Sequence, residues 1–274
     1  PAADLPRRHG RWIEQARPAV ALVHADPRCP DLLRAATDMA AASGAFLVGG
    51  LLSHNGEAAL LARGAAPGEE GSSRAGISGL LLAPAIAVAT GLTQGCMPIG
   101  PVHRIAEARE NIAMTIDGRP ALAVLREDIG PALAEDLRRI GGVIFVGLPV
   151  AGSDTGDYLV RNLLAIEPRN GWLVLDAAVA AGDPILFCRR DPDSARDDLT
   201  RMLRQLAGRI DRPPQAGIYV SCIARGRSLF GSEGVETGLI REALGDFPLV
   251  GFFANGEISR DRVYGHTGIL TLFT

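Results

Sequence analysis

Short apolar runs alternate with segments of helical periodicity along most of the chain. An apolar run at 18–24 precedes a helix that we expect to begin near Pro30 and to end at Gly44, because its apolar positions recur on one helical face. A longer amphipathic helix follows Asp191, which can cap it, and precedes a further apolar run at 217–222. This alternation predicts an α/β fold with mixed sheets and flanking helices.

The middle of the chain is expected to contain both element types. Residues 131–140 have the pattern of a helix that is stopped by the two glycines that follow. The runs at 172–176 and 184–188 are typical of strands, and a Gly-Asp turn between them predicts that they pair with each other.

The two ends of the chain share one β-α-β-β order, which indicates an internal repeat. In the first copy FLVGG (46–50) leads to HNGE (54–57), and in the second PLVGFF (248–253) leads to ANGE (254–257). Asn-Gly is typical of tight turns, because both residues tolerate positive φ. We expect two related halves in a pseudo-twofold arrangement with a ligand crevice between them. The Glu of each motif either lines that crevice or belongs only to a turn.

Composition and charge exclude several functional classes. All 28 basic residues are Arg, so lysine Schiff bases, phosphate-binding Walker lysines and Ser-Lys dyads are excluded within this sequence. The formal net charge of −3 argues against nucleic-acid and polybasic membrane partners. No apolar run approaches the roughly 18 to 20 residues that span a bilayer, so we expect no membrane partner.

Cysteine and histidine usage indicates neither a metal nor a cofactor. The 4 cysteines and 5 histidines lack the spacing of metal ligands or of a redox dithiol. A long, cysteine-poor chain without a signal peptide suits a reducing cytoplasm, so we expect a cytoplasmic protein. The sequence begins at Pro1 rather than Met, and we expect that an N-terminal piece of the natural protein is missing.

Cys222 is the candidate nucleophile if the protein is an enzyme. It ends an apolar strand before a Gly-containing loop, where α/β proteins place their sites, and Arg225 would lower the pKa of its thiol. Acyl or amide chemistry would then need a base, either Glu257 or a histidine such as His103 or His266. The alternative is a small buried cysteine that packs as an apolar side chain. The familiar nucleotide-binding, zinc-hydrolase and serine-hydrolase motifs are absent from the sequence.

Arginines beside amides or carboxylates are candidate ligand contacts. Arg161 and Asn162 are adjacent, and Arg190 precedes Asp191. An Arg of this kind can hold a ligand carboxylate through two parallel hydrogen bonds, or it can form an ordinary surface ion pair. Gln94 lies in a Gly-hinged loop that is poor in charge, which favours a defined and partly buried conformation.

The ordered set of motifs resembles the FIST sensory domain, which has an N-terminal and a C-terminal part. The resemblance covers about residues 18–274 and implies two domains, 1–118 and 119–274, of which the first is incomplete at its start. The motifs that carry it are LTQGCMPIG (92–100), DGRPAL (117–122), YLVRNLL (158–164), FCRRD (187–191), SCIARG (221–226), LFG (229–231), GFFANGEI (251–258) and TGILTLF (267–273). The motif positions that the resemblance marks as candidate contacts are Arg161, Asn162, Cys222, Arg225, Gly226, Asn255, Gly256 and Glu257.

The resemblance implies a signal-input domain that binds a small ligand, such as an amino acid, and that acts on an unknown downstream signalling protein. Under this hypothesis Arg161 or Arg225 holds a carboxylate, Glu257 holds an amine and Asn255 orients the ligand. Two alternatives stay open. One is the Cys222-dependent enzyme described above. The other is a protein-interaction module, which predicts a contiguous exposed apolar patch.

Overall fold

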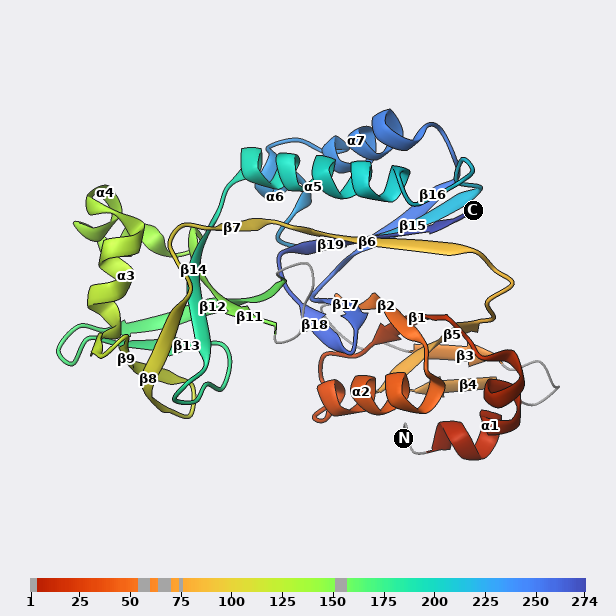
Figure 1. Ribbon diagram of the computed structural model, residues 1–274, viewed down its shortest axis with the longest axis horizontal. Helices are drawn as coiled ribbons and strands as arrows, with labels where there is room; N and C mark the ends of the chain where they lie inside the picture. The colour runs from red at the N-terminus through yellow and green to blue at the C-terminus, as the bar shows by residue number, and fades with distance from the viewer. Residues whose placement is uncertain (1–3, 54–59, 64–69, 74–75, 151–156) are drawn as a thin grey trace. The chain divides into compact units, whose positions relative to one another are not determined.

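The computed structural model describes residues 4–53, 60–63, 70–73, 76–150 and 157–274 (Figure 1). They form two compact units, one of Pro1–Gln94 with Arg196–Thr274 (unit 1) and one of Gly95–Ala195 (unit 2). Unit 1 therefore combines the two ends of the chain. The domain boundary predicted between residues 118 and 119 divides the sequence into modules and is a different division from that into compact units. It stays a prediction.

Unit 1 contains two sheets that pack face to face. The first has the strand order β18-β17-β2-β1-β5 and the second has the order β16-β15-β19-β6. Their strands are β1 (Val20–Ala25), β2 (Phe46–Leu51), β5 (Ile77–Leu82), β6 (Val88–Gln94), β15 (Ala216–Cys222), β16 (Leu249–Ala254), β17 (Glu257–Arg260), β18 (Arg262–Tyr264) and β19 (Thr267–Phe273). A separate hairpin is formed by β3 (Leu60–Arg63) and β4 (Glu70–Ser73).

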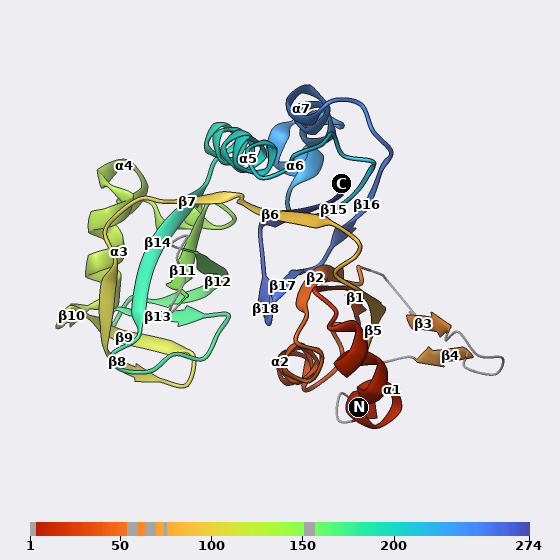
Figure 2. The ribbon, with the colours of Figure 1, turned by 45° about the vertical axis from the view of Figure 1, so that its right-hand side comes forward.

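Helices cover the outer face of each sheet, which gives unit 1 the layers α-β-β-α. Helix α2 (Leu32–Ser43) packs its buried residues on the first sheet, and α5 (Pro192–Ala207) and α7 (Val235–Leu244) pack on the second. Figures 1 and 2 show these helices on opposite sides of the paired sheets. Apolar side chains such as Val48, Leu82 and Ile269 form the core between the sheets. The remaining helices are α1 (Asp4–Ala16) and α6 (Gly226–Phe230).

The mixed α/β fold is confirmed, and the two ends share one topology. Strand β1 is parallel to β2 and antiparallel to β5, and β15 is likewise parallel to β16 and antiparallel to β19. Gly49 of β2 lies opposite Val23, and Gly251 of β16 lies opposite Tyr219. A Cβ at Gly49 would stand 1.8 Å from the Val23 carbonyl oxygen, and a Cβ at Gly251 would stand 1.9 Å from the Tyr219 carbonyl oxygen. The two glycines thus occupy equivalent places in the repeat.

Unit 2 is built on antiparallel strands that close into a ring. Strand β8 pairs with both β14 and β9, so β9, β13, β12, β11, β14 and β8 surround one core that α3 covers. The elements are β7 (Cys96–Pro98), β8 (His103–Arg109), β9 (Ile112–Ile116), β10 (Arg119–Pro120), α3 (Ala121–Ile129), α4 (Pro131–Ala134), the 3-10 helix at Leu137–Ile140, β11 (Ile144–Pro149), β12 (Tyr158–Glu167), β13 (Trp172–Leu175) and β14 (Pro184–Arg190).

Two expectations about unit 2 are wrong. The predicted helix at 131–140 is divided into α4 and a 3-10 helix, and the main helix of the unit, α3, precedes it. Strands β13 and β14 do not pair with each other, because β13 lies between β12 and β9 while β14 lies between β11 and β7. A Gly-Asp turn therefore connects strands from different parts of the ring. No helix in the described part of the chain has the length and apolar character to cross a membrane.

We expect Gly251→Ala to destabilise the protein by about 1 to 3 kcal/mol, because the added methyl group would overlap the Tyr219 carbonyl oxygen. The matched control is Gly238→Ala in α7, where no atom lies within 4 Å of the new Cβ and where Ala is favoured by about 1 kcal/mol. Denaturant unfolding measures both variants. Equal stabilities for the two would contradict the close approach of β15 and β16.

Candidate functional site

The turn after β15 brings together three of the predicted residues, Cys222, Arg225 and Gly226. The Arg225 N–H donates to the Cys222 carbonyl oxygen at 2.8 Å, and α6 begins at Gly226. Glu257, the first residue of β17, lies beside this turn, where it is in side-chain hydrogen-bond contact with Cys222 and its charge acts on the ionisation of Arg225. The carboxyl end of β15 is therefore a cluster of ionisable side chains.

Arg225 forms a buried ion pair with Glu236 of α7. Its Nε donates to Glu236 Oε1 at 2.7 Å, and the two side chains are 0% and 7% exposed. The Arg225 guanidinium also lies over the Phe230 ring, 5.4 Å from the ring centroid. Burial acts to lower the pKa of Arg225, but the nearby negative groups outweigh it and raise that pKa. Arg225 is therefore a fixed cation.

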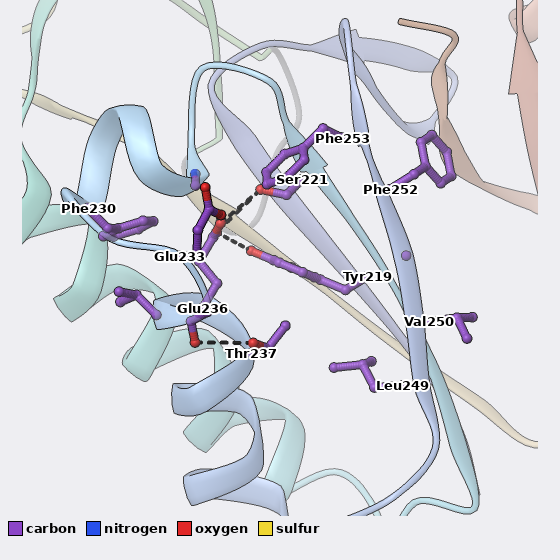
Figure 3. A pocket seen from close by; sticks show the side chains of 14 residues that line it. Tyr219, Ser221, Phe230, Glu233, Glu236, Thr237, Leu249, Val250, Phe252 and Phe253 are labelled. Carbon is purple, nitrogen blue, oxygen red and sulfur yellow. Dashed lines mark hydrogen bonds between the residues drawn. The ribbon is translucent and has the colours of Figure 1, made fainter.

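The Glu236 carboxylate is held by further donors (Figure 3). The Tyr219 hydroxyl donates to Oε1 at 2.6 Å, and the Ser221 hydroxyl donates to Oε2 at 3.1 Å. The Gly226 N–H donates to Oε2 at 3.3 Å. Hydrogen bonds of this number and kind offset the cost of burying the charge, so Glu236 fixes the orientation of Arg225.

The cluster has polar atoms that are buried without a partner. Among the residues that the structure describes, none accepts a hydrogen bond from Nη1 or Nη2 of Arg225, and none contacts Oε1 of Glu257 by a hydrogen bond. Arg225 is 1% exposed and Glu257 is 0% exposed. The charge of Arg225 is paired through Nε, but its two terminal nitrogens and Oε1 of Glu257 are buried polar atoms whose hydrogen bonds are not made, which is costly unless a water or a ligand supplies them.

Glu257 is anchored through its other carboxylate oxygen. Oε2 accepts hydrogen bonds from the Thr267 hydroxyl at 2.7 Å and from the Thr267 N–H at 3.2 Å. Burial nevertheless raises the pKa of Glu257 to about 7, because desolvation outweighs the hydrogen bonds and the Arg225 charge. The charge of Glu257 therefore changes near neutral pH.

Cys222 lacks the ionisation that a nucleophile requires. Burial, together with the neighbouring charge of Glu257, raises the pKa of its thiol to about 12. The expectation that Arg225 lowers this pKa is wrong, because Arg225 is already paired with Glu236. His103 lies in unit 2, where its ring nitrogens bond to Asp117 and Asp128.

Three other predicted residues of unit 1 have mainly structural contacts. Asn255 is exposed, and its backbone N–H donates to the Leu51 carbonyl oxygen at 3.2 Å. Gly256 has φ +127°, a conformation that favours glycine at this turn into β17. Gln94 is buried at the end of β6, and its backbone N–H donates to Asp198 at 2.6 Å. Glu57 of the first copy lies outside the described residues.

Arg161 and Asn162 belong to β12 of unit 2. The Asn162 side chain donates to Asp176 at 3.0 Å, and Arg161 Nη1 donates to the Val160 carbonyl oxygen at 2.9 Å. Burial lowers the pKa of Arg161, although the charge of Asp176 opposes this effect. These two residues form a local group in unit 2. Of the predicted site residues in unit 1, the structure brings together Cys222, Arg225, Gly226 and Glu257.

A pocket of about 240 Å³ opens between α7 and β16 beside the ion pair (Figure 3). Tyr219, Ser221 and Glu236 form its polar end, and Phe230, Leu249 and Phe253 contribute apolar walls. Among the described residues, no group of three or more His, Cys, Asp or Glu side chains is arranged to hold a metal ion.

Sequence reasoning missed the residues that support Arg225. Tyr219 and Ser221 alternate with apolar residues along β15, so both face α7, and that pattern could have indicated a polar face. Glu236 stands in the first turn of an amphipathic helix, where an acidic residue is also expected from the helix dipole alone. Its partner could not be found without the fold.

Comparison with known protein families gives matches over most of the chain. The FIST N domain matches residues 2–119, and the FIST C domain matches residues 121–260. The chain belongs to the FIST family. FIST domains are sensory domains of signal transduction, so the family gives this chain a sensory role.

The FIST chain is also similar to uncharacterized mycobacterial proteins. One from Mycobacterium tuberculosis is 34% identical over 208 residues, which is 72% of this chain and 54% of that protein. One from Mycobacterium bovis is 31% identical over 190 residues, which is 66% of this chain and 49% of that protein. The chain thus spans about half the length of these relatives.

We expect Glu236→Gln to destabilise the FIST chain by about 3 to 5 kcal/mol, because it leaves the buried Arg225 cation without its counter-ion. The matched control is Glu233→Gln, an exposed position just before α7, which should change stability by less than about 0.5 kcal/mol. Chemical denaturation compares the two variants. A stable Glu236→Gln variant would show that the pair is not the anchor of Arg225.

Glu257→Gln should remove a pH dependence of stability. The folded-state pKa of Glu257 is about 7 and its usual value is 4.5, so between these values the folded state binds more protons than the unfolded state. The stability that the neutral carboxyl of Glu257 contributes is fully present below pH 4.5 and is lost as the pH rises to about 7.

The free energy of unfolding of Glu257→Gln, relative to that of wild type, should therefore increase by on the order of 3 kcal/mol as pH rises across this range. Unfolding free energies at a series of pH values give the difference. A difference that does not change with pH would mean that Glu257 titrates normally in the folded protein.

Proposed function

We propose that this FIST chain senses a small molecule that carries a carboxylate and an amine, as an amino acid does, and that binds at Arg225 and Glu257. The observation that supports this proposal is the set of buried, unpartnered polar atoms on these two side chains, Nη1 and Nη2 of one and Oε1 of the other. Arg225 and Glu257 are 1% and 0% exposed, so bulk water does not satisfy these groups.

Arg225 is suited to hold the carboxylate. Its Nε is occupied by Glu236, which leaves the two terminal nitrogens at the far end of the guanidinium. Parallel hydrogen bonds from an Arg to a carboxylate are strong and fix the orientation of the ligand. Because Tyr219 and Ser221 also hold Glu236, the guanidinium is oriented before the ligand arrives, which lowers the entropic cost of binding.

Glu257 is suited to hold the amine. Thr267 occupies Oε2, so Oε1 is the oxygen that a ligand ammonium would meet. An ammonium group beside this carboxylate would favour its ionised form and would lower its pKa from about 7. A zwitterion supplies both opposite charges and adds no net charge of its own to the cluster.

The alternative enzyme has less support, because Cys222 is buried and its thiol pKa is raised. In the proposed function Cys222 is a neutral side chain beside the ligand. The proposal includes a cytoplasmic location and a downstream signalling protein. The output of the longer relatives is a separate question, because the chain spans about half their length.

Thermal-shift titration of the chain with L-amino acids, and with matched carboxylates that lack the amine, tests this proposal. A bound amino acid should raise Tm with concentration, and Glu257→Gln should weaken its binding by about tenfold or more. The control is Arg227→Gln, an exposed charge on α6 that should leave binding unchanged. No carboxylate-dependent shift, or equal binding by Glu257→Gln, would refute the proposed contacts.

The pH dependence of binding separates the two ligand classes. Because Glu257 takes up a proton below about 7, the affinity for an amino acid should fall as pH drops through that value. A carboxylate that lacks the amine should bind better at the lower pH, because the neutral Glu257 no longer repels it. Titrations at both pH values with each ligand measure the sign of the effect.

A further inference from the structure

Strand β16 is an end strand of the second sheet and leaves apolar side chains exposed. It pairs with β15 on one side, and no strand of the described chain pairs with its other side. Val250 is 66% exposed and Phe253 is 48% exposed. An uncovered apolar edge of this kind is a site at which another strand can add.

The equivalent edge in the first sheet is covered. Strand β2 corresponds to β16 in the repeat, and the antiparallel strand β17 pairs with its outer side, with Ile258 opposite Gly49. Val48, the counterpart of Val250, is only 1% exposed and packs in the core between the two sheets, whereas Val250 is exposed. The fold itself thus shows that an antiparallel strand is what closes an edge of this sequence and geometry.

The open edge presents a regular row of backbone groups. The Gly217 N–H donates to the Pro248 carbonyl oxygen, and the Ile223 N–H donates to the Ala254 carbonyl oxygen. In a parallel ladder alternate residues bond to the same neighbour, so the even-numbered residues of β16 face β15. Leu249, Gly251 and Phe253 therefore direct their backbone groups outward, as antiparallel pairing requires.

The sequence of this edge is complementary to itself. Residues 247–256 contain no charged side chain. If two copies of β16 run antiparallel about a twofold axis at Gly251, Leu249 lies opposite Phe253 of the second copy. Val250 then lies opposite Phe252 of the second copy. Aromatic and branched apolar side chains are favourable cross-strand neighbours, and no like charges meet.

We propose that β16 pairs with β16 of a second copy of this chain, which joins the two second sheets into one continuous sheet across a twofold axis. An isologous contact of this kind uses one patch twice and closes the assembly at a dimer. It also buries Val250 and Phe253, and it removes an edge that would otherwise promote aggregation. This inference does not depend on the proposed ligand.

The oligomeric state of the intact chain tests the dimer. Light scattering during size-exclusion chromatography should give twice the chain mass of 28.8 kDa for wild type. Val250→Lys should reduce the mass to that of one chain, because an edge lysine opposes strand pairing. The matched control is Leu80→Lys on β5, which adds the same charge at a residue that is 58% exposed, and it should remain a dimer.

A second measurement covers the case in which Val250→Lys does not fold, which circular dichroism detects. Hydrogen exchange of wild type should show amides in 249–253 that lose protection on dilution as the dimer dissociates. A wild-type chain that is monomeric overturns the proposal, and this includes the case in which the β16 edge pairs with a different protein. The proposal is also overturned if folded Val250→Lys remains a dimer or if Leu80→Lys dissociates the dimer. Hydrogen exchange in 249–253 that does not depend on protein concentration would overturn it as well.

Discussion

The site in unit 1 depends on one buried ion pair, Arg225 with Glu236. A lone guanidinium could not remain buried at the end of β15, because the loss of hydration would exceed what packing returns. Glu236 offsets that loss, and Tyr219, Ser221 and the Gly226 N–H in turn stabilise Glu236. The arrangement holds Arg225 through Nε and leaves Nη1 and Nη2 for another acceptor.

The internal repeat determines what lies beside that arginine. Strand β17 belongs to the second copy in sequence, yet it pairs with β2 of the first copy, so Glu257 is positioned by both copies. The same crossing covers the β2 edge, whereas the equivalent edge of β16 stays open. A single feature of the topology therefore places the second charged residue of the site and leaves the one edge at which we propose self-association.

Local sequence signals predicted local structure well. Asp191 caps α5 through the Ser194 N–H, Gly44 ends α2 with φ +68°, and the shared motifs gave the common topology of the two ends. Contacts that are distant in sequence were not predictable in this way. Glu236 had no visible partner, α3 lacked a distinctive pattern, and the charge of Cys222 depends on burial and on Glu257 rather than on the nearby Arg225. Topology, rather than periodicity, decides these features.

The most direct test of the account is a crystal structure of the chain grown with a saturating amino acid that raises its Tm. We predict density for the ligand with its carboxylate on Nη1 and Nη2 of Arg225 and its amine on Oε1 of Glu257. A structure in which ordered waters alone satisfy these atoms, or in which the amino acid lies elsewhere, would contradict the central claim that the buried ion pair prepares Arg225 for a ligand.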